Sequence, residues 1–418
     1  DTVFLTDTNN LKNVDPMLGP LAFNGGPTQT HALLAGSPAI DKGSNPAMLT
    51  FDQRGPGFPR VVGPQADIGA VEISVRLPDR FVASGPPTGE AQTFEFDAMG
   101  MAQPVGAAFT PFPGFSGDVR ATVGDFDGDG KFDVAYGIGP GGGSEVRLVT
   151  SGGADVTVTV YEATFTGGVF LAAGDFDGDG KDELVVSPDQ GGGGRVVSFR
   201  FDGSNLLRFA DFFGIVDPDF RGGARVGVGD LDGDGLADLL VAAGFTGGPR
   251  VAVFDGSKIL ANGITADPEP LKFIPDFFVF ENTLRNGVFV TSGDITGDGK
   301  WDMIFGGGPG GGPRVLILDS VEVLAGNVNA EILNPVANFF AGDITQRGGI
   351  RLTTANIDDD ARADLVTGSG EGFPAQVRTY LGEILDGFQA TDTMLEPPRQ
   401  ELLTPFGGAT LSAGVFVG

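Results

Sequence analysis

Five copies of one short acidic loop constrain the fold of this chain more than any other feature. They begin at residues 125, 175, 230, 294 and 356, and their shared pattern is Asp-x-Asp-Gly-Asp-Gly-x-x-Asp. Side-chain oxygens at positions 1, 3, 5 and 9, with the backbone carbonyl of position 7, predict a cage for a hard cation. Glycine at position 6 allows the sharp inward turn. Calcium suits such a cage best, because it accepts six to eight oxygens in flexible geometry.

Ordinary turns are the alternative interpretation, because Asp-Gly clusters also form turns that bind nothing. That alternative does not explain the acidic residue at position 9, so the cation cage is favoured. The last loop departs furthest from the pattern, since Asn356 replaces the first Asp and Ala361 replaces the glycine. Alanine at a positive φ costs on the order of 1 kcal/mol. The fourth loop is intermediate, because Thr296 stands where a carboxylate is expected.

The composition indicates a globular, acidic chain that lacks thiol chemistry. Its 418 residues, 41% of them apolar, are enough for two or three domains, and its 70 glycines follow no Gly-X-Y period. The net charge of −29 argues against nucleic acid and anionic membrane surfaces as partners. Cysteine is absent, which excludes disulfides, zinc–thiolate sites and cysteine nucleophiles. A single histidine, His31, leaves little room for imidazole-based catalysis.

The ends of the sequence and its apolar runs bear on where the chain resides. No apolar run approaches 18 residues, so we expect no transmembrane segment. The chain shows no signal peptide and begins at Asp1 rather than at Met. We therefore expect a processed chain or a piece of a longer one.

The spacing of the acidic loops predicts propeller blades. Successive loops start 50, 55, 64 and 62 residues apart, and each period contains four strand-like segments. The first strand enters the cage, as in Gly168–Gly174, and the second leaves it, as in Glu183–Ser187. The third follows a glycine-rich turn, as in Arg314–Asp319, and the fourth is aromatic, as in Phe277–Phe280. Helical periodicity is weak throughout, with one turn compatible with Val321–Ala325.

The count of strands predicts that the two ends of the chain share one blade. Arg80–Ser84, Thr93–Asp97 and Val105–Phe109 precede the first cage and match strands two, three and four. Gly414–Gly418 is left over at the end and matches strand one. Pairing these segments closes the ring and removes a free sheet edge. The expected fold is therefore all-β, a six-bladed β-propeller with C-terminal strand closure.

The repeated blocks also resemble a known family. F-x-G-G-V, G-D-x-D-G-D-G and G-x-G-P-G-G-G-P-R-V are similar to FG-GAP repeats, the integrin-α-like or VCBS family, over roughly residues 78–418. The resemblance implies a β-propeller with up to five Ca²⁺ ions, and the departures described above predict weaker fourth and fifth cages. The implied ligands, with position 7 acting through its carbonyl, are Asp125, Asp127, Asp129, Lys131 and Asp133; Asp175, Asp177, Asp179, Lys181 and Glu183; Asp230, Asp232, Asp234, Leu236 and Asp238; Asp294, Thr296, Asp298, Lys300 and Asp302; and Asn356, Asp358, Asp360, Arg362 and Asp364.

Residues 1–77 differ from the rest, because turn-rich segments alternate with short apolar strands and no cage is present. DPMLGPLAFNGGPTQTHALL, GSPAID and ADIGAVE resemble the C-terminal end of right-handed parallel β-helix domains in large bacterial surface proteins. The resemblance implies that residues 1–77 form the cap-like end of a solenoid. Residues 72–79 are then a linker to an FG-GAP-type domain at residues 78–418.

No convincing catalytic constellation is present in the sequence. The obvious carboxylate pairs lie in the cages, and a calcium ion whose ligands all come from protein acts as a strut rather than as an open Lewis acid. The glycine-rich turns, such as Gly139–Gly143, lack the Gly-Lys-Ser/Thr of a phosphate loop. Arg195, Arg250 and Arg314 recur after these turns, and we expect them to pair with nearby carboxylates.

Two functions follow from these observations. The first is a non-enzymatic, calcium-stabilised module of a large bacterial protein, extracellular or at the cell surface, which mediates adhesion, binds a protein or glycan, or self-assembles. The alternative is the accessory domain of a secreted carbohydrate-active enzyme, a lyase or hydrolase, whose active site lies upstream. Acidic residues outside the cages that line one groove would favour the alternative, and the sequence shows no such cluster. Analogy with other propellers favours ligand binding around the channel, on the face opposite the cages.

Overall fold

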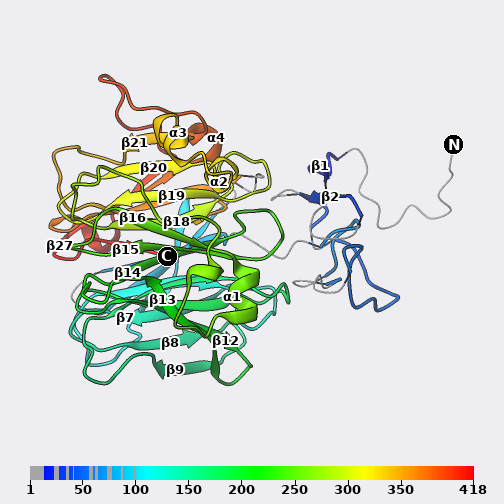
Figure 1. Cartoon of the computed structure of the whole chain (residues 1–418), viewed down its shortest axis with the longest axis horizontal. Helices are drawn as coiled ribbons and strands as arrows, with labels where there is room; N and C mark the ends of the chain where they lie inside the picture. The colour runs from blue at the N-terminus through cyan, green and yellow to red at the C-terminus, as the bar shows by residue number, and fades with distance from the viewer. Residues whose placement is uncertain are drawn as a thin grey trace.

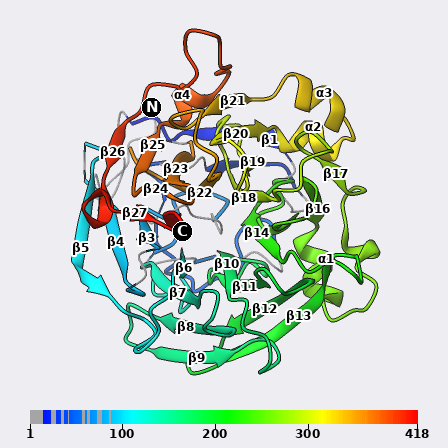
Figure 2. The same cartoon turned by 90° about the vertical axis from the view of Figure 1, so that its left-hand side faces the viewer.

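The computed structural model describes residues 14–22, 28–33, 37–40, 42–55, 60–61, 65–72, 78–85, 88–97, 99–358, 360 and 362–418. In this part of the chain, six antiparallel four-stranded sheets stand around a central axis as the blades of a β-propeller. Figure 2 shows the ring with the C-terminus at its centre. The predicted fold class is confirmed.

Each blade runs from an innermost strand at the channel to an outer strand at the rim. The first contains β28 (Phe416–Val417), β3 (Arg80–Ser84), β4 (Ala91–Phe96) and β5 (Ala102–Phe109); the second β6 (Val119–Gly124), β7 (Asp133–Ile138), β8 (Glu145–Val149) and β9 (Asp155–Thr159); the third β10 (Val169–Gly174), β11 (Glu183–Pro188), β12 (Gly194–Phe201) and β13 (Leu206–Ile215). The fourth contains β14 (Ala224–Gly229), β15 (Asp238–Ala243), β16 (Arg250–Phe254) and β17 (Phe277–Phe278); the fifth β18 (Val288–Gly293), β19 (Asp302–Gly307), β20 (Arg314–Leu318) and β21 (Ala337–Phe340); the sixth β22 (Ile350–Ala355), β23 (Asp364–Ser369), β25 (Val377–Tyr380) and β26 (Glu401–Leu403).

The C-terminal strand closes the ring as predicted. Phe416 pairs with Ser84 and Val417 with Ala83, so β28 is the innermost strand of the blade that the N-terminal side begins. The innermost strands β6, β10, β14, β18, β22 and β28 contact one another in a closed circle. Because the first blade takes its innermost strand from the chain end, it has no loop between strands one and two, which explains why there are five acidic loops and six blades.

The blades pack through strands that are buried on both faces. Every residue of β11, β14 and β15 is buried, as expected for strands covered by a neighbouring blade on each side. Between the second and third blades, for example, Phe126, Leu148 and Leu184 belong to one fully or almost fully buried apolar cluster. The core is therefore divided into layers between blades rather than gathered in one centre.

In several blades, a glycine at positive φ before the innermost strand allows close approach to the previous blade. Gly168 has φ +83°, and a Cβ there would lie 2.5 Å from the backbone carbon of Gly139 in the neighbouring blade. Gly223 repeats this arrangement at φ +75°, with the carbonyl oxygen of Pro188 at 2.5 Å. The Gly-Gly pair of the repeat is thus required by backbone conformation and by space.

Short helices extend the connections between third and fourth strands. They are α1 (Gly256–Asn262), α2 (Ser320–Leu324), α3 (Val328–Leu333) and α4 (Gly382–Leu385), with the 3₁₀ turn η1 (Glu269–Leu271); a second 3₁₀ turn, η2 (Pro405–Gly408), follows β26. A turn was expected only near α2; the other three helices were missed, because four to seven residues are too few to show a helical period. A small sheet of β24 (Phe373–Pro374) and β27 (Thr410–Leu411) precedes the closing strand. None of the helices in the described residues is long and apolar enough to cross a membrane.

The N-terminal segment lies beside the propeller, on the side of α1 and α2 (Figure 1). Its described strands, β1 (Leu18–Ala22) and β2 (Thr30–Leu33), form an antiparallel pair. Buried ion pairs Arg54–Asp52, at 2.9 Å, and Arg60–Glu72, at 2.7 Å, tie its later part together. The β-helix-end resemblance and the boundary at residue 77 stay predictions, and most of the expected linker, residues 73–77, lies outside the described residues.

Candidate metal centres

The acidic loops connect first and second strands at one end of the blades, and their backbone is organised by the carboxylates of positions 1 and 9. In the first loop, Asp125 accepts hydrogen bonds from the backbone N–H groups of Gly128, at 2.8 Å, and Gly130, at 2.9 Å. Asp133 accepts one from the N–H of Phe126, at 3.0 Å. Loops two, three and four repeat both features, and the fifth repeats the second of them through Asp364.

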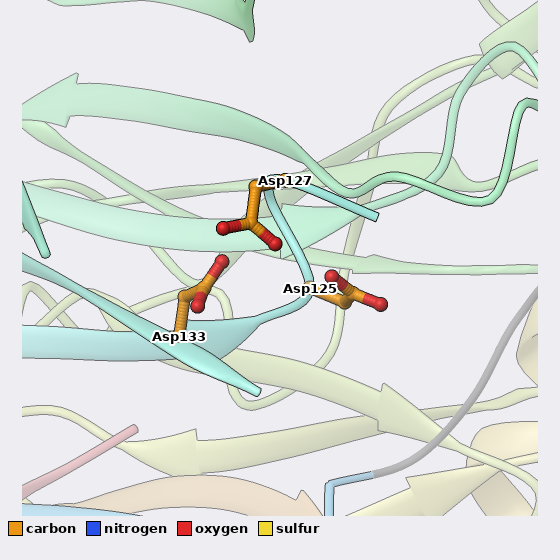
Figure 3. Close-up of side chains that lie close together, drawn as sticks. All are labelled: Asp125, Asp127 and Asp133. Atoms are coloured by element: carbon orange, nitrogen blue, oxygen red, sulfur yellow. The ribbon is translucent and has the colours of Figure 1, made fainter. Parts of the chain in front are cut away.

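Four of the five loops gather three carboxylates, with one ligand oxygen from each residue within 4.8 Å of the others. Figure 3 shows the first of these groups, with the carboxylates of Asp125, Asp127 and Asp133 close together. The four groups are Asp125, Asp127 and Asp133; Asp175, Asp177 and Glu183; Asp230, Asp232 and Asp234; and Asp358, Asp360 and Asp364.

The fourth loop forms no such group among the described residues. Thr296 replaces the acidic side chain of position 3, so Asp294, Asp298 and Asp302 are its carboxylates. The fifth loop brings three carboxylates together although Asn356 replaces the first Asp. Ala361, the other departure in that loop, lies outside the described residues.

The other predicted ligands make hydrogen bonds of their own near these groups. At position 5, Asp129 accepts from the N–H of Lys131 at 2.9 Å and from the hydroxyl of Ser151 at 2.8 Å. Asp179 likewise accepts from the N–H of Lys181 at 3.0 Å. In the third loop Asp238 lies outside the close group and accepts from the N–H of Gly256 at 2.8 Å. Residues Leu236, Lys300 and Arg362 donate their N–H groups to the position-5 carboxylates of their own loops in the same way.

Burial of these carboxylates fits a cation as their partner. Loss of solvation, with repulsion between neighbouring carboxylates, raises the pKa of Asp133 to about 6, of Asp364 to about 7, and of Glu183 to about 8. The pKa of Asp230 is raised to about 8 by the same two causes, and that of Asp175 lies well above its usual value. A divalent cation with oxygen ligands would compensate this clustered charge. The residues present therefore fit calcium, which would serve as a strut between the strands.

At the second loop, an arginine side chain competes with a metal ion for two of the candidate ligands. The loop motif does not predict this arginine. Arg200, on β12, lies 2.6 Å from a carboxylate oxygen of Asp177 and 3.0 Å from one of Glu183. Both carboxylates are candidate ligands, so the guanidinium neutralises part of the charge that a metal would use. Arg200 follows its loop by 17 residues, outside the motif.

Hydrogen bonds between backbones join the loops into a belt. The carbonyl of Asp125 accepts from the N–H of Asp182 in the second loop, at 2.8 Å. Position 1 of each following loop accepts in the same way from position 8 of the next: Ala237 to Asp175, Trp301 to Asp230 and Ala363 to Asp294, at 2.7 to 2.8 Å. The Asp182 carboxylate also accepts from the N–H of Asp125, at 2.7 Å. The backbone of each of these loops is thus bonded directly to that of the next.

Sequence comparison supports the repeat assignment. A family model described as FG-GAP-like repeat matches residues 175–241, which run from the second cage into β15. The chain therefore carries an FG-GAP-like repeat within a six-bladed propeller. No curated protein sequence matches the chain.

Several solved structures align with the chain at low identity. Rhamnogalacturonan lyase YesW is 13% identical with a TM-score of 0.30, over 74% of this chain and 66% of that one. The C-terminal domain of PilY1 from Pseudomonas aeruginosa is 12% identical with a TM-score of 0.37, over 68% and 70%. The lectin of Aleuria aurantia is 9% identical with a TM-score of 0.40, over 74% and 94%. The chain thus spans just under two thirds of the lyase, and none of these similarities carries an argument about activity.

Proposed function

We propose that this chain is a calcium-stabilised, non-enzymatic binding module of a larger extracellular or cell-surface bacterial protein. The observation that carries the proposal is the belt of five acidic loops, which backbone hydrogen bonds join in series at one end of the blades and four of which gather three close carboxylates. Extracellular calcium, at millimolar concentration, suits sites whose Kd is roughly 10⁻⁴ to 10⁻³ M. Calcium would then fix the ring, and the ring would present the surface that binds a protein or glycan or a second copy of the chain.

The end of the blades opposite the cages offers a place for a ligand. A cavity of about 580 Å³ opens there around the channel, lined by residues of several blades. Cavities of this size hold small ligands or single units of larger ones. We therefore propose that the ligand binds at the glycine-turn end and that metal binds at the other end.

A second candidate function, the accessory domain of a carbohydrate-active enzyme, gains one observation from the structure. Asp118, Asp189 and Glu371, all outside the cages, line the same cavity, whereas the sequence indicated no such cluster. Arg120 lies 3.1 Å from Asp118 and 2.6 Å from Asp189, and Arg351 lies 3.2 Å from Glu371. Each of these carboxylates forms an ion pair with a guanidinium. The group therefore resembles a set of neutralised ion pairs more than a pair of catalytic carboxylates that act as acid and base.

Binding of the full chain to immobilised glycans and to bacterial cell surfaces tests the first proposal. We expect retention in 1 mM calcium and loss of retention after chelation with EGTA, with recovery when calcium is restored. Incubation of the same protein with polysaccharides, monitored for new reducing ends and unsaturated products, tests the alternative. Cleavage of a polysaccharide by this chain would contradict the non-enzymatic assignment.

A further inference from the structure

Arginine and phenylalanine alternate around the mouth of the channel at the glycine-turn end. The second residues of β6, β14 and β22 are Arg120, Arg225 and Arg351. The equivalent residues of the other three innermost strands are Phe170, Phe289 and Phe416. All six line the cavity described above, so one side chain from each blade contributes to a single ring, the Arg/Phe ring.

Each guanidinium of the Arg/Phe ring lies against two phenylalanine rings. Arg120 is 4.9 Å from the ring centre of Phe170 and 4.6 Å from that of Phe416. Arg225 lies 3.8 Å from the ring centre of Phe289 and 5.8 Å from that of Phe170. Arg351 lies 4.8 Å from Phe289 and 5.1 Å from Phe416. Aromatic faces stabilise a buried cation but accept no conventional hydrogen bond from its edge.

The three arginines are almost fully buried, yet they are unequally paired. Only 5% of Arg120, 4% of Arg225 and 2% of Arg351 is exposed. Arg120 contacts two carboxylates, and Arg351 contacts Glu371 and donates to the carbonyl of Ala413 at 2.6 Å. Arg225 has neither a carboxylate nor a hydrogen-bond acceptor in the part of the chain that the structure describes, and its Nε and Nη1 are buried without one.

The unpaired guanidinium of Arg225 calls for an acceptor from outside the chain. A buried charged group without an acceptor is costly. Burial lowers the pKa of Arg225, and the charges of Arg351 and Arg120 add to this lowering, while Asp189 and Glu371 oppose it. A guanidinium nevertheless keeps its proton at neutral pH, so the positive charge remains. The cavity beside it is large enough to admit a ligand that supplies the missing oxygens.

The geometry points to a binding site for the carboxylate of an acidic saccharide at the Arg/Phe ring, with Arg225 as its principal contact. A planar carboxylate can accept two parallel hydrogen bonds from one guanidinium edge. The exposed rim of the cavity carries neutral hydrogen-bonding side chains, Thr164, Thr166 and Gln190, which suit the hydroxyls of a sugar. This inference deepens the proposed binding function and rests on it for its biological use.

The three acidic residues of the rim restrict the charge of the ligand. Asp118, Asp189 and Glu371 balance the formal charges of the three arginines, so the cavity as a whole is near neutral. A dianion such as phosphate would be repelled by these carboxylates more strongly than a monoanion would. We therefore expect monovalent carboxylates to bind better than inorganic phosphate.

The test uses the full calcium-loaded chain labelled with ¹⁵N-arginine. Glucuronate is titrated while the Nε–Hε resonances are followed by NMR, and the Arg225 resonance is assigned by its absence from Arg225→Lys. We expect a saturable shift of that resonance at millimolar glucuronate, no shift with glucose, and a weaker effect of inorganic phosphate. Calorimetry should show at least a tenfold loss of glucuronate affinity in Arg225→Met.

A matched arginine variant and further ligands serve as controls. Arg314→Met, in which the altered arginine lies on β20 and pairs with Asn338, should bind glucuronate as the wild type does. If Arg225→Met does not fold, the NMR titration of the wild type still shows whether glucuronate binds at Arg225. That titration needs only Arg225→Lys, to assign the resonance. Absence of any shift, equal binding of glucose, or tighter binding of phosphate would overturn the inference. Stronger binding of acetylglycinate than of glucuronate would overturn the saccharide assignment and identify a peptide carboxylate instead.

The inference and the proposed function fail in different ways. Glucuronate binding without retention on any glycan or cell surface would refute the proposed surface-binding function but would still support the carboxylate site. Calcium-dependent retention that is equal in the wild type and in Arg225→Met would refute the carboxylate site but would still support the proposed binding function.

Discussion

The two ends of the blades bury charge of opposite sign by different means. At the cage end, each group of carboxylates comes from one loop of about nine residues, and backbone N–H groups hold its first and last members. At the glycine-turn end, three guanidinium groups are held against phenylalanine faces, and each blade supplies one side chain. A cage is therefore local to its repeat, whereas the Arg/Phe ring is assembled only when six blades close.

This difference determines which changes to the protein should disrupt the cages and which should disrupt the Arg/Phe ring. We expect the loss of one cage ligand to leave the channel undisturbed, although backbone hydrogen bonds connect the altered loop to the next one. The Arg/Phe ring needs the closing strand, because Phe416 lies between Arg120 and Arg351. Changes to closure, metal and single side chains should thus separate the two ends in a definite order of severity.

Deletion of Gly414–Gly418 should have the largest effect, because it opens the ring and affects both ends. Val415, Phe416 and Val417 are each at least 91% buried, and burying three such side chains is worth roughly 5 kcal/mol at about 1.5–3 kcal/mol each. We expect aggregation or unfolding even at saturating calcium, measured by size exclusion and thermal melting. Phe416→Leu, which keeps the strand, should remain folded. A truncated chain that melts within a few degrees of the intact one would refute closure.

Removal of calcium should have the next largest effect and should act first on the cage end. At 1 mM calcium and a Kd of about 0.1 mM, each occupied site contributes roughly 1.4 kcal/mol. The melting temperature should therefore fall markedly in EGTA and recover when calcium is added. Magnesium at the same concentration should restore much less of it. An unchanged melting temperature would contradict metal stabilisation.

The effect of calcium should depend on pH in a direction that the buried carboxylates set. The folded-state pKa of Glu183 and Asp230 is raised to about 8, and that of Asp364 to about 7, against unfolded values near 4. Between those limits the calcium-free folded state binds more protons than the unfolded state, so its stability rises as pH falls from 8 to about 5. Calcium needs deprotonated ligands, so its contribution falls over the same range. The gap in melting temperature with and without EGTA should narrow from pH 8 to 5.5; a widening gap would contradict this.

Single ligand changes should rank the cages. Asp127→Ala removes a carboxylate from a loop that keeps the full pattern, and Asp358→Ala removes one from the loop that begins with Asn356. We expect the first variant to lose more calcium-dependent stability, by about 1 kcal/mol, because the full cage binds more tightly. Calcium titrations followed by thermal melting measure both, with Asp202→Ala, an exposed turn residue, as the control. Equal losses would refute the ranking.

Removal of the Arg200 guanidinium, which competes with calcium at the second cage, should have the smallest effect. Arg200→Met removes the guanidinium that contacts Asp177 and Glu183 while keeping a long apolar side chain against Phe209. Calcium affinity of the second cage should rise a few-fold, and the calcium-free protein should become less stable. Calorimetry on the variant and on Arg208→Met, a neighbour paired with Asp211, provides the comparison. Unchanged affinity in Arg200→Met would show that the guanidinium does not compete.

The acidic loops and the closure of the ring were predictable from sequence because the loop motif recurs along the chain and the strands of each repeat can be counted. The loop motif fixes its own backbone, and the leftover strand Gly414–Gly418 could be counted. The Arg/Phe ring was not predicted, although its residues stand at equivalent positions such as Arg120 and Phe170. The repeat pattern consists of residues that recur in every blade, whereas these residues alternate between Arg and Phe from blade to blade. Arg200 was missed because its contact depends on the pairing of β12 with its blade, which no spacing shows.

Terbium luminescence is the most direct test of the claim that the acidic loops hold cations. Trp301, the single tryptophan of the chain, belongs to the fourth loop and donates its backbone N–H to Asp230 of the third at 2.8 Å. Excitation of Trp301 should therefore sensitise Tb³⁺ bound in either cage. We predict saturable emission that millimolar calcium displaces and that Asp230→Ala combined with Asp294→Ala abolishes in a folded protein. Absence of sensitised emission, or its persistence in the double variant, would contradict the account.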